Sequence, residues 1–223
     1  MNMYMRGVAH CGRQMTWLAA VTMALSVVAI PAAYSQNIVD EWSQVQAPSP
    51  PALKAVRIDP ASTALIVMDI SVRTCAHAKR PRCTRTLPAI ARLVRAARAS
   101  SVLVLYSLVG HDKRSDIPKA FAARASDTVI TGAGPDKFVG SDLEAILKAK
   151  RIKTLIAVGT SAEGAVLNTA SGAVFRGFDV VVPVDGMSSD TLYGEQSTAW
   201  YLAHAPRVSQ VTTVTTVDRM RFK

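Results

Sequence analysis

Short apolar runs alternate with amphipathic helical patterns through most of the chain, and this alternation limits the folds open to it. The runs at 63–69 and 102–106 are almost continuously apolar, as in parallel strands covered on both faces. Between them, apolar side chains recur at helical spacing over 87–99. The pattern continues with helices at 141–151, about 164–176 and about 192–204, and with strands at 154–158, 178–184 and 208–217. Such alternation predicts a parallel sheet joined by right-handed crossovers.

A sheet of this kind also predicts where a functional site lies. Ligands bind beyond the carboxyl ends of parallel strands. Three segments end there: Asp69 after the first run, the loop at 132–140, and the turn at 159–165 that leads into a helix. The polar stretch at 110–134 is predicted to be a long loop, and loops of that length are often functional.

The first 35 residues have the pattern of a signal peptide. Arg6 and Arg13 precede an apolar run at 17–30, and Ala33 and Ser35 are small residues suited to signal peptidase. We therefore predict cleavage after Ser35 and a periplasmic or secreted protein. A retained membrane anchor is the alternative, although the run is shorter than the ~20 apolar residues of a spanning helix.

The rest of the chain divides into a lead-in and one domain. Residues 36–61 are proline-rich around 47–51, which predicts a linker or an arm packed on the surface. Residues 62–223 are predicted to form the folded domain, and a hydrophobic content of 49% in the 223-residue chain is enough for one sizeable core.

The basic charge does not by itself indicate nucleic acid. The net charge is +10, and removal of residues 1–35 takes two arginines from 26 basic residues, which leaves 24 against 16 acidic residues, or +8. The bases are scattered, without a basic stripe or an aromatic platform. We expect a solvated basic surface, no nucleic-acid partner, and no membrane partner once the leader is cleaved.

Two cysteines, Cys75 and Cys83, remain after the predicted cleavage, since Cys11 lies in the leader. In an oxidising compartment this even, closely spaced pair predicts a local disulfide that clamps the loop after the first strand. Catalytic or metal-binding roles are the alternatives. His77 alone cannot complete a four-ligand metal site, and we expect no metal and no cofactor.

Several motifs in a fixed order resemble the isochorismatase-like (cysteine hydrolase) superfamily. Residues 64–69 match its apolar strand that closes on an aspartate, and residues 138–143 read Phe-Val-Gly-Ser-Asp-Leu, against Phe-x-Gly-Thr-Asp-Leu in the family. Residues 154–184 correspond to the strand, turn, helix and strand around the family's nucleophile. The resemblance covers about the last 160 residues. It implies a three-layer α/β/α fold with a mainly parallel sheet of about six strands and a Rossmann-like topology.

The resemblance also implies a site of an aspartate, a lysine and a cysteine, in which the thiolate attacks an amide or a similar carbon. Asp69 matches the aspartate, but Ala165 stands where the cysteine is expected. The lysine position falls near Gly132, so Lys137 is the candidate lysine, with a surface lysine as the alternative. Siderophore-pathway isochorismatases also lack the cysteine, and their aspartate acts as a general acid while water attacks a vinyl ether. Asp69 is predicted to take that part.

Other residues near the expected site have two interpretations each. Glu163 either stabilises a helix start or serves as a replacement acid or base. Thr160 and Ser161 either cap the helix or bind substrate. We predict that Phe138, Arg73 and Ala165 also border the substrate, with a solvated arginine as the alternative for Arg73. Nicotinamidase-like relatives bind zinc through one Asp and two His, a spacing that is not found here.

Two functions are consistent with these residues. The leading hypothesis is an exported hydrolase of a small anionic molecule, in which Asp69 moves a proton and Lys137 or Glu163 assists water. The alternative is a non-catalytic periplasmic domain for ligand binding or assembly. Family members are commonly oligomeric, so we expect a homo-oligomer, and the apolar residues at 200–202 either join subunits or complete the core.

Overall fold

The computed structural model describes residues 37–132 and 134–223, so the predicted leader lies outside the described residues. The chain separates into two compact units, one ending at Gln46 and one running from Ala47 to Lys223. In the first, α1 (Ile38–Glu41) follows Asn37, whose side chain accepts a hydrogen bond from the Val39 amide at 2.8 Å. No helix of the described residues is both long and apolar enough to cross a membrane.

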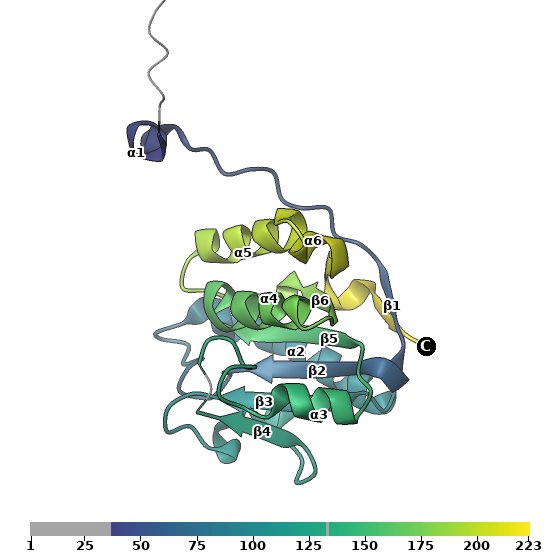
Figure 1. Cartoon of the computed structure of the whole chain (residues 1–223). Helices are drawn as coiled ribbons and strands as arrows, with labels where there is room; N and C mark the ends of the chain where they lie inside the picture. The colour runs from purple at the N-terminus through teal and green to yellow at the C-terminus, as the bar shows by residue number, and fades with distance from the viewer. Residues whose placement is uncertain (1–36, 133) are drawn as a thin grey trace, which may run out of the picture. The chain divides into compact units, whose positions relative to one another are not determined.

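The second unit is built on a parallel sheet (Figure 1) with the strand order β4-β3-β2-β5-β6-β8. Every neighbouring pair in it is parallel, and the short β7 adds to β5. The predicted α/β fold with a mainly parallel sheet is therefore confirmed. The strands are β2 (Thr63–Met68), β3 (Leu103–Leu108), β4 (Thr128–Thr131), β5 (Thr154–Thr160), β6 (Asp179–Pro183), β7 (Met187–Ser188) and β8 (Thr212–Thr215).

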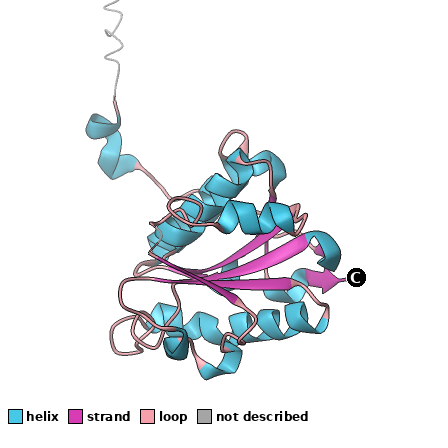
Figure 2. Ribbon diagram, turned by 60° about the horizontal axis from the view of Figure 1, so that its bottom comes forward, coloured by secondary structure: helices cyan, strands magenta, loops and turns pink. Residues whose placement is uncertain are grey.

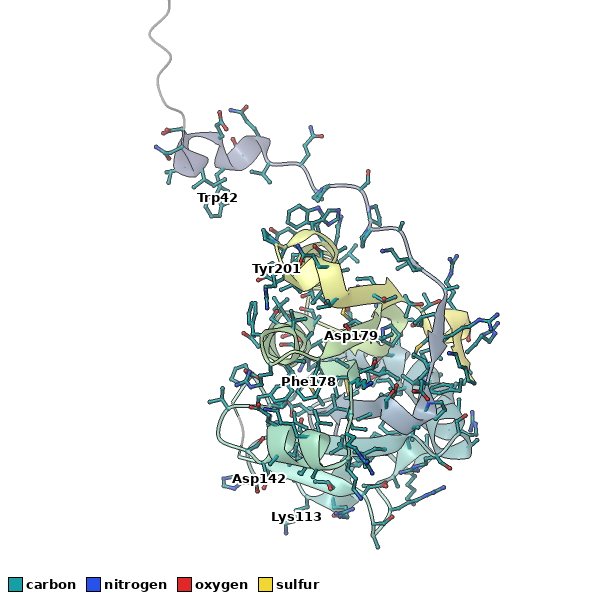
Figure 3. All side chains as sticks on the ribbon, turned by 45° about the vertical axis from the view of Figure 1, so that its right-hand side comes forward. Trp42, Lys113, Asp142, Phe178, Asp179 and Tyr201 are labelled. Atoms are coloured by element: carbon teal, nitrogen blue, oxygen red, sulfur yellow. A yellow bond between two sulfur atoms is a disulfide. The ribbon has the colours of Figure 1, made fainter. Side chains whose placement is uncertain are left out.

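Helices cover both faces of the sheet, as Figure 2 shows. One face packs on α2 (Pro81–Ala99), and the other packs on α3 (Leu143–Ala149), α4 (Leu167–Phe175), α5 (Leu192–His204) and α6 (Val208–Val211). Alternate residues of β2 enter the two cores: Ile66 joins one and Leu65 the other. This two-sided burial explains the unbroken apolar run of β2. The side chains drawn in Figure 3 fill these layers, with Phe178 among the buried ones.

A second, two-stranded sheet joins the end of the predicted lead-in to the C-terminus. β1 (Val56–Ile58) pairs in parallel with β9 (Met220–Phe222). Ile58 and Met220 are buried in the same core as α2. The last residues of the predicted proline-rich lead-in are therefore part of the folded domain.

Several predicted boundaries need correction. The predicted strand at 208–217 is α6 followed by β8, because the chain turns at Arg207, which has a left-handed backbone (φ +65°). The predicted loop at 110–134 contains β4 and two short 3₁₀ turns. α2 begins six residues earlier than the predicted 87, with Pro81 in its first turn, where a missing amide hydrogen costs little. A π-helical turn, Ala162–Val166, precedes α4.

Candidate active site

A pocket of about 330 Å³ opens at the carboxyl ends of the central strands. Residues after β2 and β5 contribute to it, as does the 132–140 loop. Its charged lining residues are Asp69, Arg80 and Lys137, and its hydroxyl-bearing lining residues are Thr74, Thr160 and Ser161. The pocket therefore lies where the parallel sheet predicts a ligand site.

Asp69 directly follows β2 and has a left-handed backbone (φ +57°). That conformation is tolerated by aspartate more readily than by most residues, although it still costs free energy. The turn is held by the Asp69 amide, which donates to the Ser107 carbonyl at 3.0 Å, and by Thr74 Oγ1, which donates to the Asp69 carbonyl at 2.7 Å. These bonds direct a side chain that is only 8% exposed into the pocket lining.

The Asp69 carboxylate has a buried partner on each oxygen. Lys137 Nζ lies 2.7 Å from Oδ2, and Ser107 Oγ donates to Oδ1 at 2.7 Å. Lys137 is only 1% exposed, and its ammonium also donates to the Gly134 carbonyl at 3.0 Å. A buried charge of this kind is tolerated only when it is paired and hydrogen-bonded. The structure thus brings the two predicted catalytic residues, Asp69 and Lys137, into direct contact.

The backbone of Lys137 is anchored from the neighbouring helix. Its amide donates to Thr169 Oγ1 of α4 at 3.1 Å. Lys137 thereby reaches Asp69 although it lies five positions after Gly132, where counting along the motif places the family lysine.

Ala165 lies in the π-helical turn between β5 and α4 and lines the same pocket. The residue is 4% exposed, and its methyl group carries no atom that can attack a substrate or transfer a proton. A covalent route through residue 165 is therefore excluded, whereas Asp69 and Lys137 themselves offer proton transfer and charge stabilisation.

The other predicted site residues divide into two groups. Thr160 and Ser161 line the pocket, and Thr160 Oγ1 donates to the Ser188 carbonyl at 3.2 Å. Phe138 instead stacks on Phe178, with ring centroids 5.9 Å apart, and Arg73 forms ion pairs with Asp112 and Asp116. Phe138 and Arg73 are absent from the pocket lining among the described residues.

Glu163 faces a polar network rather than the pocket. Its Oε1 accepts from Ser189 Oγ at 2.6 Å. The Ser189 amide donates to Glu195, which also accepts from Arg82 Nε at 2.8 Å. Hydrogen bonding to Glu195 raises the pKa of Arg82 above its usual value. Glu163 contacts neither Asp69 nor Lys137 in the described hydrogen bonds, so its placement favours the structural interpretation over the catalytic one.

Sequence reasoning missed Ser107. It is the one serine of an apolar strand, β3, and lies near the end of that strand. Its register partner in β2 is Met68, the residue before Asp69. The register of the two strands could not be read from the sequence, although a lone serine at a buried strand end was a usable signal.

The predicted disulfide is present in the structure. Cys75 and Cys83 are joined, with their Cα atoms 5.3 Å apart, and both are buried. The bond closes the loop between Asp69 and α2, which also carries the pocket residues Thr74 and Arg80. Over residues 37–132 and 134–223, no three His, Cys, Asp or Glu side chains cluster in a way that could hold a metal ion.

Comparison with known families identifies the domain. Residues 63–216 match the family model of the isochorismatase domain. The chain belongs to the isochorismatase family. A search of curated proteins found no significant match.

Solved structures of this family share the fold. An isochorismatase family protein from Desulfovibrio vulgaris superposes with a TM-score of 0.62 at 21% identity, over 70% of this chain and 95% of that one. An N-carbamoylsarcosine amidase from Thermoplasma acidophilum gives 0.61 at 22% identity, over 70% and 97%. A nicotinamidase from Staphylococcus aureus gives 0.62 at 20% identity, over 70% and 99%. At these identities the likeness shows the isochorismatase-like hydrolase fold alone.

Proposed function

We propose that this protein hydrolyses a small anionic molecule by an aspartate-assisted mechanism that does not use a cysteine. The observation that carries the proposal is the buried ion pair of Asp69 and Lys137, which lines a pocket beside the methyl group of Ala165. A buried carboxylate at a pocket wall, with both oxygens fixed, is typical of a group that transfers protons.

The proposed step places water in the space beside Ala165. Water attacks the electrophilic carbon of the substrate, and its proton passes to the Asp69 carboxylate, which then returns that proton to the leaving group. Asp69 thus acts first as a general base and then as the general acid that the resemblance implies. The Lys137 ammonium stabilises negative charge that forms in the low-dielectric pocket, and the Ser107 hydroxyl holds Asp69 in position. One proton of the water therefore ends on the leaving group, the hydroxyl stays on the product carbon, and Asp69 returns to the carboxylate form.

Charge supports an anionic substrate, and the disulfide supports export. Asp69 and Lys137 cancel each other's charge, so Arg80 leaves the charged lining of the pocket with a net positive charge. A buried disulfide favours an oxidising compartment, in agreement with the predicted signal peptide at 1–35 and with a periplasmic or secreted location.

Self-association is part of the proposal. Of the three apolar residues at 200–202, Leu202 completes the core, whereas Trp200 and Tyr201 remain 39% and 38% exposed on α5. Exposed aromatic side chains of this kind are enriched in protein interfaces. Sedimentation of the purified chain and of a W200A/Y201A variant tests this point: the variant is expected to dissociate, and equal masses for the two proteins would contradict it.

A non-catalytic binding domain is the second candidate, favoured by the absent nucleophile at Ala165. It shares the pocket with the hydrolase, so turnover separates the two. The test measures turnover of vinyl ethers, amides and cyclic imides by wild type, by Asp69→Asn, and by Asp218→Asn as a matched control with an exposed aspartate.

The hydrolase predicts turnover of at least one anionic member of the panel by wild type and by D218N. Loss of a proton-transfer group typically slows the reaction about 10²–10⁴-fold, which is the effect expected for D69N. Equal rates for D69N and wild type would remove Asp69 from the mechanism. No turnover by wild type would leave the binding domain as the function.

A further inference from the structure

Arg80 is a largely covered arginine whose hydrogen-bonding capacity is not used by the described residues. Its side chain is 23% exposed, and it lines the pocket with Asp69 and Lys137. Among the described residues its guanidinium donates no aligned hydrogen bond. Nε lies 2.8 Å from Asp190 Oδ1 but is a buried nitrogen without a hydrogen-bond partner.

Two comparably covered arginines show what a structural arginine does in this fold. Arg82, with 27% side-chain exposure, donates to both oxygens of Glu195. Arg98, with 15%, donates to Asp127 and to the Ala122 carbonyl. Arg98 Nε is also a buried nitrogen without a partner, but Arg98 donates from a terminal nitrogen. Arg80 differs from both because no nitrogen of its guanidinium donates an aligned hydrogen bond to the described residues. A covered guanidinium without a protein acceptor can be satisfied by an acceptor group of a bound ligand.

The backbone holds Arg80 in a fixed relation to Asp69. The Arg80 amide donates to the Ala76 carbonyl at 2.8 Å, and the Cys75–Cys83 bond closes the loop around it. At the other end of this loop, Thr74 Oγ1 donates to the Asp69 carbonyl. Arg80 precedes α2 without a side-chain capping bond, so its side chain has no capping duty.

From these contacts we propose that Arg80 binds a carboxylate of the substrate, and that Asp190 competes for the same guanidinium when the pocket is empty. The planar guanidinium matches a carboxylate with two parallel hydrogen bonds. The substrate class is therefore a small molecule with a carboxylate set apart from the bond that is cleaved. The inference rests on the proposed function only in placing the substrate in this pocket.

Binding of benzoate, measured by titration calorimetry on the purified chain, tests this role without turnover. Benzyl alcohol serves as the neutral probe. The variants are Arg80→Gln, Asp190→Asn, and Arg85→Gln as a control that removes the same charge from an exposed position of α2. Circular dichroism of each variant confirms that it is folded.

We expect R80Q to weaken benzoate binding about tenfold or more, because a charge-assisted pair is lost. Binding of benzyl alcohol changes less than about twofold, and R85Q resembles wild type. Asp190 is 74% exposed in its side chain, so its contact is weak, and D190N tightens benzoate binding by about two- to fivefold.

Equal affinity of wild type and R80Q for benzoate, including no binding by either, would overturn the assignment, and so would weaker binding by D190N. Benzoate binding that depends on Arg80, in a protein that hydrolyses none of the panel, would support the carboxylate site and reject the proposed hydrolase. The two proposals therefore fail separately.

Discussion

At the residue scale, one methyl group determines which chemistry the site can perform. Ala165 borders the same pocket as the ion pair of Asp69 and Lys137, so the acid–base part of the site is present without the cysteine nucleophile that the family resemblance implies. Both charges are almost fully buried, and unpaired charges at such positions are strongly destabilising.

Ser107 is expected to position Asp69. Replacement by alanine removes the 2.7 Å hydrogen bond to Oδ1, and a bond to a charged group contributes about 1.5–3 kcal/mol. We predict that S107A lowers kcat about 10- to 100-fold with little change in KM, and that S107T restores part of the loss. Steady-state kinetics on a substrate from the panel measure this. S171A is the control, because the buried Ser171 hydroxyl has no partner among the described residues, and equal kcat for both variants would contradict the role.

Because of Tyr106, we predict that the protein loses stability at alkaline pH. Burial raises the pKa of its phenol from 10.0 to about 12, and the hydroxyl donates to the Phe121 carbonyl at 2.8 Å. The folded state holds this proton more tightly than the unfolded state. The protonated phenol therefore contributes fully to the free energy of unfolding below about pH 10, and this contribution is lost as pH rises towards 12. A shift of this size corresponds to roughly 2–3 kcal/mol.

Urea unfolding of wild type and Y106F between about pH 9 and 11.5 measures this effect. The free energy of unfolding of wild type should fall more steeply with pH than that of Y106F. Parallel pH profiles for the two proteins would show that Tyr106 does not cause the loss.

At the element scale, the loop between β2 and α2 is closed by the Cys75–Cys83 bond. A disulfide that closes a loop with a sequence separation of 8 restricts the unfolded chain, which corresponds to about 2–3 kcal/mol in the chain-entropy treatment. We predict that C75S/C83S loses about that much stability in urea unfolding without reductant. A variant as stable as wild type would show that the bond does not stabilise the domain.

The sequence predicted helices and strands correctly where the hydrophobic pattern was long and capping residues marked its ends. The helix predicted at about 192–204 matches α5, whose start is capped by Thr191 accepting from the Gly194 amide at 3.0 Å. The segment at 208–217 failed because its β-branched residues suggest a single strand, whereas α6 has only four residues and therefore too little periodicity to detect. The strands β1 and β9 were missed because each has only three residues, which is too short for a detectable pattern.

At the scale of the whole molecule, the alternation of strands and helices was enough to predict a parallel sheet covered on both faces. The site also followed in part. β2 lies between β3 and β5, so chain crossovers run in opposite directions from this point, and the residues that follow β2 and β5 meet there. Asp69, Thr160 and Ser161 were therefore predictable. Lys137 was already a candidate from the family resemblance, but its contact with Asp69 depends on the path of a loop. The contacts of Ser107 and Arg80 depend on strand register and on side-chain positions that the tertiary structure supplies.

The proposed hydrolysis proceeds by direct attack of water, without a covalent intermediate. Intact-protein mass spectrometry during single turnover tests it most directly, with the best panel substrate and with wild type and Ala165→Cys side by side. We predict that wild type forms product and never gains mass, whereas A165C accumulates an adduct on residue 165. A substrate-derived adduct on wild type, or wild type without turnover beside an active A165C, would contradict the claim.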